Sequence, residues 1–348
     1  MINNEQIMAG YIQGLPQQFR ESLHMEYDFL GRYKGKYENI LICGMGGSAI
    51  GGDILRTWGL AEAPLPIIIN RDYNIPRFIG KNSLVMAVSY SGNTEETLQA
   101  YQGAKESGAA IICVTSGGKL AELARANGDG LAVIPGHLVP RAASGYLMAP
   151  AALILEQLDL LPGARAAVEE TADLLAGMQQ TLGPEAEPDK NQARQIAACL
   201  QGSLPLIWGV AGTTEAAAMR WKGQINENAK SPAFFNLFPE LDHNEIVGFE
   251  MPEELLAHAV VIILRDRSGP ERVEQRIAIT KEIILPRVKA VIEVESTGTS
   301  FLARLYSLIY TGDYVSYYLA LNYGLDPTPV KAIDFLKAEL ARKGLPAI

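Results

Sequence analysis

The chain has 348 residues, of which 48% are hydrophobic, and a formal net charge of −9. This length exceeds that of one average domain and predicts two domains with substantial cores. Because the negative charge is spread along the chain without a long acidic or basic block, the composition argues against partners such as nucleic acid and anionic membranes.

The beginning of the chain, "MINNEQIMAG", lacks the charged and apolar regions of a signal peptide. The longest aliphatic runs, such as 259–264, are too short to cross a membrane. Cys43, Cys113 and Cys199 are an odd number of cysteines, and the first two fall in strand-like apolar runs. We therefore expect a soluble, cytoplasmic protein whose cysteines are buried, reduced and unreactive.

Residues 38–160 alternate between short β-branched runs and helical patterns, which predicts βαβ units around a parallel sheet. The expected strands are "ENILICG", "PLPIIIN", "SLVMAVSYSG", "AAIICVTSGG" and "GLAVIPG", with helices over 48–59, 94–107 and 118–126. The stretch 146–182 is continuously helical in pattern, and the Pro and acidic residues of 183–192 indicate a linker.

The second half begins as the first does, with the apolar run "LPLIWGV" leading through a Gly-Thr-Thr turn into a helix. The segments "AHAVVIILRD" and "AVIEVES" are further expected strands, with helices over 270–285 and 299–323. The sequence thus predicts two tandem doubly wound α/β domains, 1–182 with an N-terminal helical segment and 193–348. The closing segment "DPTPVKAIDFLKAELARKG" predicts an amphipathic helix that docks on the body.

A glycine-rich turn, "GMGGSAIGGD" at 44–53, follows the first strand. Its first six residues match the dinucleotide fingerprint G-x-G-x-x-[GA]. That fingerprint also requires an acidic residue closing the second strand, where it holds a ribose hydroxyl. Here the second strand ends in Asn70, with Asp72 just beyond it, so the pattern leans against NAD.

A second strand-to-helix turn carries the hydroxyls of Ser89, Ser91 and Thr94. Together with the N–H groups of a helix start, they are suited to one compact oxyanion such as a phosphate monoester. The alternative is an ordinary helix cap, because Ser or Thr three residues before Glu is the capping-box pattern. The hydroxyls in excess of what a cap needs favour phosphate.

The turn "SYSGNTEET" resembles the signature of the sugar isomerase (SIS) domain, which binds phosphosugars. With "GMGGSAIGGD", "NENAKSPAFFN" and "ELDHNEIVGF" in this order, essentially the whole chain resembles the bifunctional phosphoglucose/phosphomannose isomerases of the phosphoglucose isomerase superfamily. The resemblance implies two SIS-type domains with mostly parallel sheets. It also implies a cofactor-free, metal-independent isomerase that interconverts glucose 6-phosphate and mannose 6-phosphate with fructose 6-phosphate.

An aldose–ketose isomerase opens the sugar ring and moves a proton between C2 and C1, so it needs acid–base groups at two places. By the resemblance, Glu227 is the catalytic base, although a solvated helix-end glutamate is the commoner case. His243 matches the family's ring-opening acid, which the neighbouring subunit supplies, so the resemblance implies a homodimer with composite sites. Since no histidine pair has ligand spacing, a zinc site is not expected.

The remaining site residues also follow from the resemblance. Arg141 matches the family's active-site arginine, with a surface salt bridge as the alternative. Gly47 and Ser48 are expected at the sugar, and Thr328 is a candidate for contacting C2. Lys337 is favoured over Lys331 as the family's C-terminal catalytic lysine, although this chain extends beyond the position where the shortest relatives end.

Four functions stay open at this stage. The isomerase reading, for the reaction above or for another SIS sugar-phosphate isomerisation, predicts turnover. A non-catalytic phosphosugar-binding module predicts binding without turnover, and a dehydrogenase predicts nicotinamide binding. A SIS-type amidotransferase or deaminase would need a glutaminase domain and an N-terminal nucleophilic cysteine, which these residues do not contain.

Overall fold

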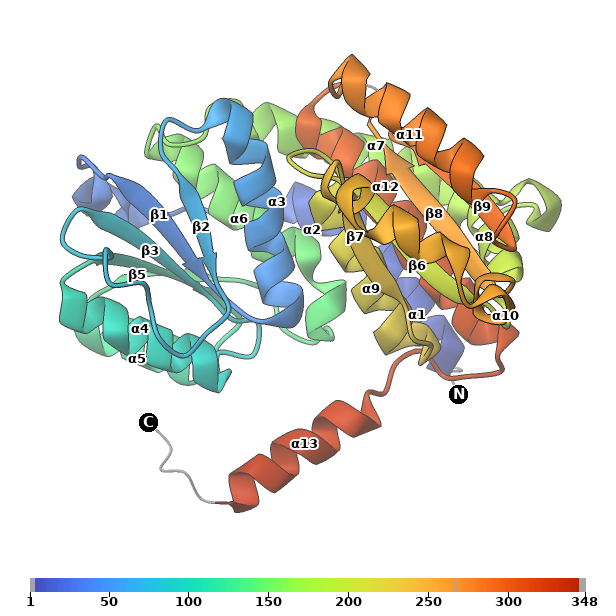
Figure 1. Cartoon of the computed structure of the whole chain (residues 1–348). Helices are drawn as coiled ribbons and strands as arrows, with labels where there is room; N and C mark the ends of the chain where they lie inside the picture. Colours follow the sequence, from blue (N-terminus) through green and yellow to red (C-terminus); the bar gives the residue numbers. More distant parts are fainter. Residues whose placement is uncertain (1–3, 267, 344–348) are drawn as a thin grey trace.

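Two parallel sheets flanked by helices form the computed structural model, which describes residues 4–266 and 268–343 (Figure 1). Sheet A has the order β2-β1-β3-β4-β5, and sheet B has the order β7-β6-β8-β9, which is the same arrangement with no fifth strand among the described residues. The fold class expected from the sequence is confirmed. The strands are β1 (Asn39–Cys43), β2 (Ile67–Asn70), β3 (Ser83–Val88), β4 (Ala110–Thr115), β5 (Gly130–Val133), β6 (Leu204–Val210), β7 (Phe234–Phe238), β8 (Ala259–Arg265) and β9 (Ala290–Glu295).

Helices cover both faces of each sheet, as a parallel sheet requires. In the first half they are α1 (Asn4–Gln13), α2 (Leu15–Ser22), α3 (Gly46–Glu62), α4 (Glu95–Ser107), α5 (Gly118–Asn127), α6 (Ser144–Gln157) and α7 (Ala164–Leu182). In the second half they are α8 (Gln192–Leu200), α9 (Glu215–Ala229), α10 (Glu253–Leu256), α11 (Glu271–Ile284), α12 (Phe301–Asn322) and α13 (Lys331–Arg342). Short 3-10 helices are η1 (Asp28–Tyr33), η2 (Pro140–Ala142), η3 (Pro188–Lys190), η4 (Glu240–His243) and η5 (Glu245–Glu250).

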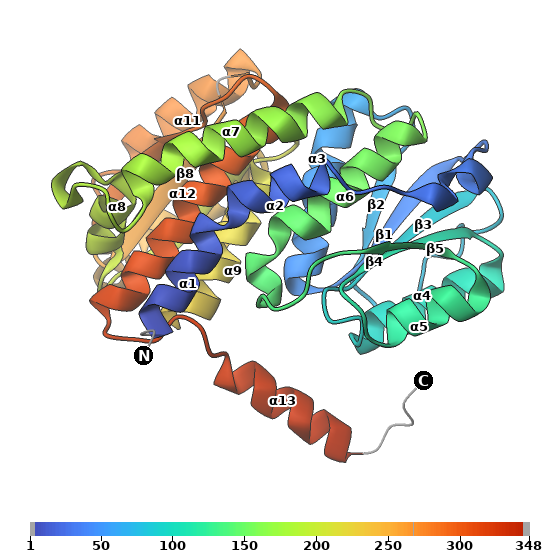
Figure 2. The same ribbon diagram turned by 180° about the vertical axis from the view of Figure 1, so that it is seen from behind.

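One hydrophobic core runs through both halves. It includes Ile42 of β1, Leu153 of α6 and Tyr310 of α12. Helix α12 is buried along most of its length and packs on α9, α8 and α7, while α3 packs on α6 and α9. Figure 2 shows α7 extending from the second half toward the first, where it packs on α2 and α6. This shared core brings the C-terminal turn of α9 beside the loops of sheet A.

The connection at 183–191 between α7 and α8 is ordered by Asn191, which is fully buried. The Asn191 side chain caps α8 by accepting from the Arg194 N–H (3.1 Å) and donates to the Leu182 carbonyl (2.9 Å). Sheet A lies before this connection and sheet B after it. We keep 183–192 as our proposal for the division between the two domains.

Two local expectations were wrong, and one strand was not expected. The stretch 146–182 is two helices, because the chain turns through left-handed backbone at Asp159 (φ 61°) and Gly163 (φ 75°) around Pro162. Strand β7 was missed because it is an edge strand that pairs only with β6 and shows no clear alternation in burial. Cys199 is partly exposed, whereas Cys43 and Cys113 are buried.

The terminal helix α13 forms where an amphipathic helix was expected, but it does not dock on the body. It projects away from both sheets (Figure 1). Its apolar side chains are exposed, with Phe335 68% and Leu336 57% accessible. Within the described residues, no helix has the length and apolar character needed to span a membrane.

Candidate active site

Two turns expected to bind substrate meet at the carboxyl edge of sheet A. The glycine turn (residues 44–53) follows β1, and the turn that carries Ser89, Ser91 and Thr94, here called the hydroxyl turn, follows β3. These two strands are neighbours in the sheet. Because the chain leaves β1 toward β2 on one side and β3 lies on the other, this is the switch point where doubly wound sheets bind ligands. The Ser48 Oγ accepts a hydrogen bond from the Tyr90 N–H (3.2 Å), which joins the two turns.

The hydroxyl turn is organised by its own serines. The Ser89 Oγ accepts from the Gly92 N–H and donates to the Thr94 Oγ1, both at 3.1 Å. The Ser91 Oγ accepts from the Asn93 N–H (3.2 Å), and Ser91 is exposed. Thr94 occupies the N-cap position of α4, yet its side chain makes no capping hydrogen bond. The hydroxyls therefore serve the turn itself and are not consumed as a helix cap.

The glycine turn also touches a third loop, η2, which carries Arg141. A Cβ atom added to Gly47 would lie 2.8 Å from the Pro140 carbonyl oxygen and 3.1 Å from the Arg141 Cα. The first separation is shorter than a Cβ atom tolerates and the second is unusually tight, so the close approach of the two loops requires glycine at position 47. Gly47 thereby sets the position of the arginine relative to the sheet edge.

Arg141 extends from the first half into the second and is only 4% exposed. One of its terminal nitrogens, Nη1, lies 3.6 Å from the Glu227 Oε2. The other, Nη2, donates to the carbonyls of Pro327 and Thr328, each at 2.8 Å. Burial lowers the pKa of Arg141, and the charge of Glu227 partly offsets this effect. Because an arginine guanidinium keeps its proton in proteins, a buried cation here faces the Glu227 carboxylate.

Glu227 lies in the last turn of α9, where its side chain remains 31% exposed and so reachable by a ligand. The helix ends at Lys230, whose backbone is left-handed (φ 55°). The Lys230 Nζ donates to the Glu227 carbonyl (2.6 Å) and to the Pro327 carbonyl (3.0 Å). Burial lowers the pKa of Lys230, and the nearby Arg141 cation lowers it further.

Lys230 and the fully buried Asn228 are site residues that the sequence analysis did not identify. Both lie in "NENAK" beside Glu227, so the motif was the available signal. The Asn228 Oδ1 accepts from the Arg141 Nε (2.8 Å).

His243 lies at the other end of sheet B from Glu227. Helix α9 leads from the carboxyl end of β6 to the amino end of β7, and His243 follows the carboxyl end of β7. The five residues of β7 alone span about 16 Å. His243 is exposed, while the adjacent Asp242 contacts Arg276 and Thr280 of α11. One chain therefore does not bring His243 and Glu227 together.

The C-terminal candidates divide into two groups. Thr328 lies at the site, where its carbonyl oxygen contacts Arg141. Lys331 and Lys337 are exposed on α13, which projects from the body, so this arrangement of the chain does not bring either lysine to Glu227 (Figures 1 and 2).

A hollow of about 600 Å³ lies elsewhere, between residues 73–79 and helix α4. It is open to solvent, and none of its lining residues belongs to the three loops described above. We therefore assign the candidate site from the contacts among its side chains. The hollow at residues 73–79 is a different part of the surface.

Comparisons with known proteins relate the whole chain to sugar-phosphate enzymes. Residues 67–133 match the SIS domain, and residues 189–340 match the bacterial phospho-glucose isomerase C-terminal SIS domain. The bifunctional phosphoglucose/phosphomannose isomerase of Caldicellulosiruptor bescii is 46% identical over 96% of this chain and 99% of its own. The enzyme of the same name from Aquifex aeolicus is 35% identical over 95% and 97% of the two chains.

The chain is also similar to a relative with a different named activity and to solved structures that share its fold. The D-glucosamine-6-phosphate 4-epimerase of Sulfolobus acidocaldarius is 32% identical over 78% of this chain and 82% of its own. The C-terminal domain of glucosamine-fructose-6-phosphate aminotransferase from Francisella tularensis superposes with a TM-score of 0.71 at 16% identity, covering 92% of this chain and 97% of that one. At this identity, the structural similarity supports the fold alone.

Proposed function

Because the chain belongs to the bifunctional phosphoglucose/phosphomannose isomerase family, we propose that it interconverts glucose 6-phosphate and mannose 6-phosphate with fructose 6-phosphate. One observation carries this proposal beyond family membership. The glycine turn packs against the loop that carries Arg141, and Arg141 faces Glu227. The turns proposed to bind the substrate and an accessible carboxylate therefore lie close together.

The substrate phosphate binds at the hydroxyl turn. Ser89, Ser91 and Thr94 supply hydroxyl donors, and the amino end of α4 supplies backbone N–H groups and a partial positive charge. Gly47 and Ser48 then lie beside the sugar, because their turn is bonded to the hydroxyl turn. Phosphate bound here places the carbon chain between sheet A and Glu227.

Glu227 acts as the base that moves the proton. In the open-chain aldose, its carboxylate takes the proton from C2, the electrons of that C–H bond form the C1–C2 double bond, and the carbonyl electrons move to O1, which takes up a proton to give an enediol. Return of the proton to C1, with loss of the O2 proton, yields the ketose. The Arg141 cation stabilises the negative charge that develops on the enediolate oxygens. Both C2 epimers share this base if the C2–C3 bond can rotate in the open chain.

Ring opening requires an acid near the ring oxygen, and we assign it to His243 of a second subunit. His243 and Glu227 of one chain lie at opposite ends of β7, which supports a composite site. In such a site, the histidine beside Glu227 comes from a partner chain. The proposal therefore includes a homodimer. Lys337 is the second acid–base group, with Lys331 as the alternative, and α13 must move or pack on a partner for either to act.

The proposal also includes a cytoplasmic location. Cysteines that are free, as Cys43, Cys113 and Cys199 are here, persist most readily in a reducing compartment.

The test is a coupled assay with glucose 6-phosphate and mannose 6-phosphate in parallel. For Glu227→Gln we expect both activities to fall by about 10²- to 10⁴-fold, the usual contribution of a general base. Binding of fructose 6-phosphate, measured by calorimetry, should be retained. The exposed Glu282→Gln on α11 is the matched control and should leave both activities unchanged.

Turnover by Glu227→Gln at the wild-type rate would overturn the assignment of the base. Binding without turnover by the wild type would instead indicate a phosphosugar-sensing module. Repeating both assays in EDTA tests metal dependence, since loss of the mannose 6-phosphate activity alone would point to a metal.

A further inference from the structure

The side chain of Asn228 lies behind the Arg141 guanidinium, away from Glu227. Asn228 is fully buried in the last turn of α9, one residue after the proposed base. Its Oδ1 accepts from the Arg141 Nε at 2.8 Å. An arginine Nε has a single N–H, and this bond fixes the orientation of the guanidinium together with the bonds from Nη2 to the Pro327 and Thr328 carbonyls.

The orientation of the Asn228 amide is itself determined by α12. The Asn228 Nδ2 donates to the Ser316 Oγ (2.9 Å), and the Ser316 hydroxyl donates to the Asp313 carbonyl (2.8 Å). Because the hydroxyl proton is used on Asp313, Ser316 can only accept from Asn228. The amide therefore cannot flip without losing both of its hydrogen bonds.

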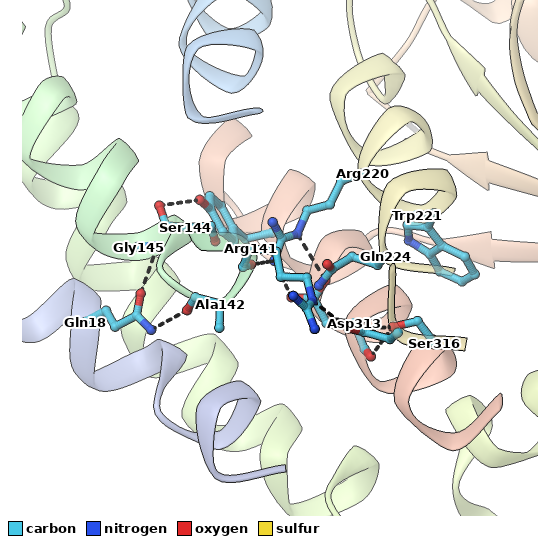
Figure 3. Close-up of polar contacts among 12 residues, drawn as sticks. Gln18, Arg141, Ala142, Ser144, Gly145, Arg220, Trp221, Gln224, Asp313 and Ser316 are labelled. Carbon is cyan, nitrogen blue, oxygen red and sulfur yellow. Dashed lines mark hydrogen bonds and ion pairs between the residues drawn. The ribbon is translucent and has the colours of Figure 1, made fainter. Parts of the chain in front are cut away.

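The backbone of Arg141 is held by the same helix pair. The Arg220 Nη2 donates to the Arg141 carbonyl (3.0 Å), and Arg220 forms a buried ion pair with Asp313 (Figure 3). Gln224 adds a hydrogen bond to the Asp313 carboxylate (2.8 Å). With the main chain anchored in this way, the remaining freedom of Arg141 is rotation of its side chain, which Asn228 restricts at Nε and the Pro327 and Thr328 carbonyls restrict at Nη2.

We propose that Asn228 is a positioning residue for the isomerase reaction, which directs the Arg141 guanidinium toward Glu227 and the enediolate, and that Ser316 sets its amide. This inference rests on the proposed function. Without the oxygen on Nε, the guanidinium can turn to find another acceptor for its buried N–H, and its charge leaves the reacting oxygens. A displacement of about 1 Å at a reacting centre can cost about 10²-fold in rate.

The experiment compares Asn228→Leu with Asn228→Asp in the glucose 6-phosphate assay. We expect Asn228→Leu to lower kcat about 10²-fold while KM changes less than about threefold, because the phosphate contacts lie on the other half of the site. Asn228→Asp keeps an acceptor for the Arg141 Nε and should retain at least about a tenth of kcat. Asn191→Leu, at another fully buried asparagine, should lower the melting temperature without changing kcat.

A double-mutant cycle with Arg141→Met identifies the route of the effect. If Asn228 acts through Arg141, Asn228→Leu lowers kcat no further in the Arg141→Met background. Multiplicative effects, or a kcat of Asn228→Leu equal to that of the wild type, would overturn the proposal. Should Asn228→Leu not fold, Ser316→Ala replaces it in the cycle, with an expected loss of several-fold in kcat.

A wild type that converts neither sugar would count against the proposed function and not by itself against the role of Asn228. In that case the crystal structure of Asn228→Leu decides the inference. A guanidinium turned away from Glu227 supports it, and an unchanged guanidinium overturns it.

Discussion

The two halves of the molecule share a sheet topology but use the same turns for different purposes. In the first half, the turns after β1 and β3 present glycines and hydroxyls at the sheet edge. In the second half, the turn after β6 is tied into the fold, because the Thr214 Oγ1 donates to the Leu264 carbonyl (2.9 Å). The next residue, Glu215, contacts Arg56 and Thr57 of α3.

The turn after β8 also differs from its counterpart after β3, because its polar side chain is paired within the fold. It carries Asp266, whose carboxylate is paired with Arg304 and accepts from the Ser296 hydroxyl (3.2 Å). The second half therefore has no hydroxyl turn like that of the first among its described residues. Its contribution to the site comes from α9 and α12, as charges and buried hydrogen bonds. We therefore propose that the two halves divide substrate binding from catalytic support.

The largest effect is expected at the buried ion pair of the second half. Asp313→Ala removes the partner of Arg220, and both side chains are 4% exposed. Leaving a buried charge unpaired costs about 3–5 kcal/mol in the free energy of unfolding. Urea denaturation measures this loss, and Asp173→Ala at the exposed pair with Arg20 should cost less than about 1 kcal/mol. Equal losses in the two variants would mean that the buried pair does not support the second half.

Next comes the glycine turn of the first half. Gly47→Ala forces the new Cβ against Pro140 and moves Arg141, so we expect kcat/KM to fall about 10²-fold. Gly212 occupies the corresponding turn after β6, where a Cβ would meet only the Leu60 Cδ1 at 3.7 Å. Gly212→Ala should keep its activity and lose only stability through its positive φ of 78°. Similar activities of the two variants would contradict the division of roles.

A smaller effect is expected from the hydroxyls. Ser89→Ala combined with Ser91→Ala should raise KM for both sugar phosphates about tenfold or more, because hydrogen bonds to a charged phosphate contribute about 1.5–3 kcal/mol. Ser268→Ala, in the turn after β8, is the second-half counterpart and should leave KM unchanged. Steady-state kinetics under identical salt conditions compare them. A KM that rises in Ser268→Ala and not in the double variant would mean that the second half binds the phosphate, and would contradict the comparison.

The smallest effect concerns the contact between α7 and the start of α12. The Glu170 carboxylate accepts from the N–H groups of Thr299 (2.5 Å) and Ser300 (2.8 Å). Burial by itself would raise the pKa of Glu170, but the hydrogen bonds from Ser300 and Thr299 outweigh it and hold the pKa below its ordinary 4.5.

Because this pKa is depressed in the folded protein, the stabilisation is present above pH 4.5 and is lost as the pH falls through the folded-state value. Glu170→Gln should therefore lower stability at pH 7 by less than about 1 kcal/mol and have less effect near pH 3. Thermal melts at the two pH values measure the difference. A larger effect at pH 3 would reverse the sign and refute the explanation.

Much of the fold was predictable from local patterns. Runs such as those of β3 and β8 are almost entirely apolar, because helices cover both faces of a parallel sheet. The edge strand β7 lacks that pattern and was missed, and the break between α6 and α7 was missed because the residues on either side of Pro162 are equally helical in composition. The position of α13 was not predictable, because an apolar stripe does not say which surface, if any, it packs on.

By itself, the sequence determined the two sheets, the turns that carry Gly47 and Ser89, and the family resemblance that named Glu227 and Arg141, because these depend on residues close together in the chain. Only the tertiary structure decided which groups surround Glu227. Asn228 and Arg141 are 87 positions apart, and Arg141 and Thr328 are 187 apart. Such contacts depend on how α9 and α12 pack beside sheet A, and no local pattern records that packing. The separation of His243 from Glu227 has the same origin, since it follows from the direction of α9 relative to β7.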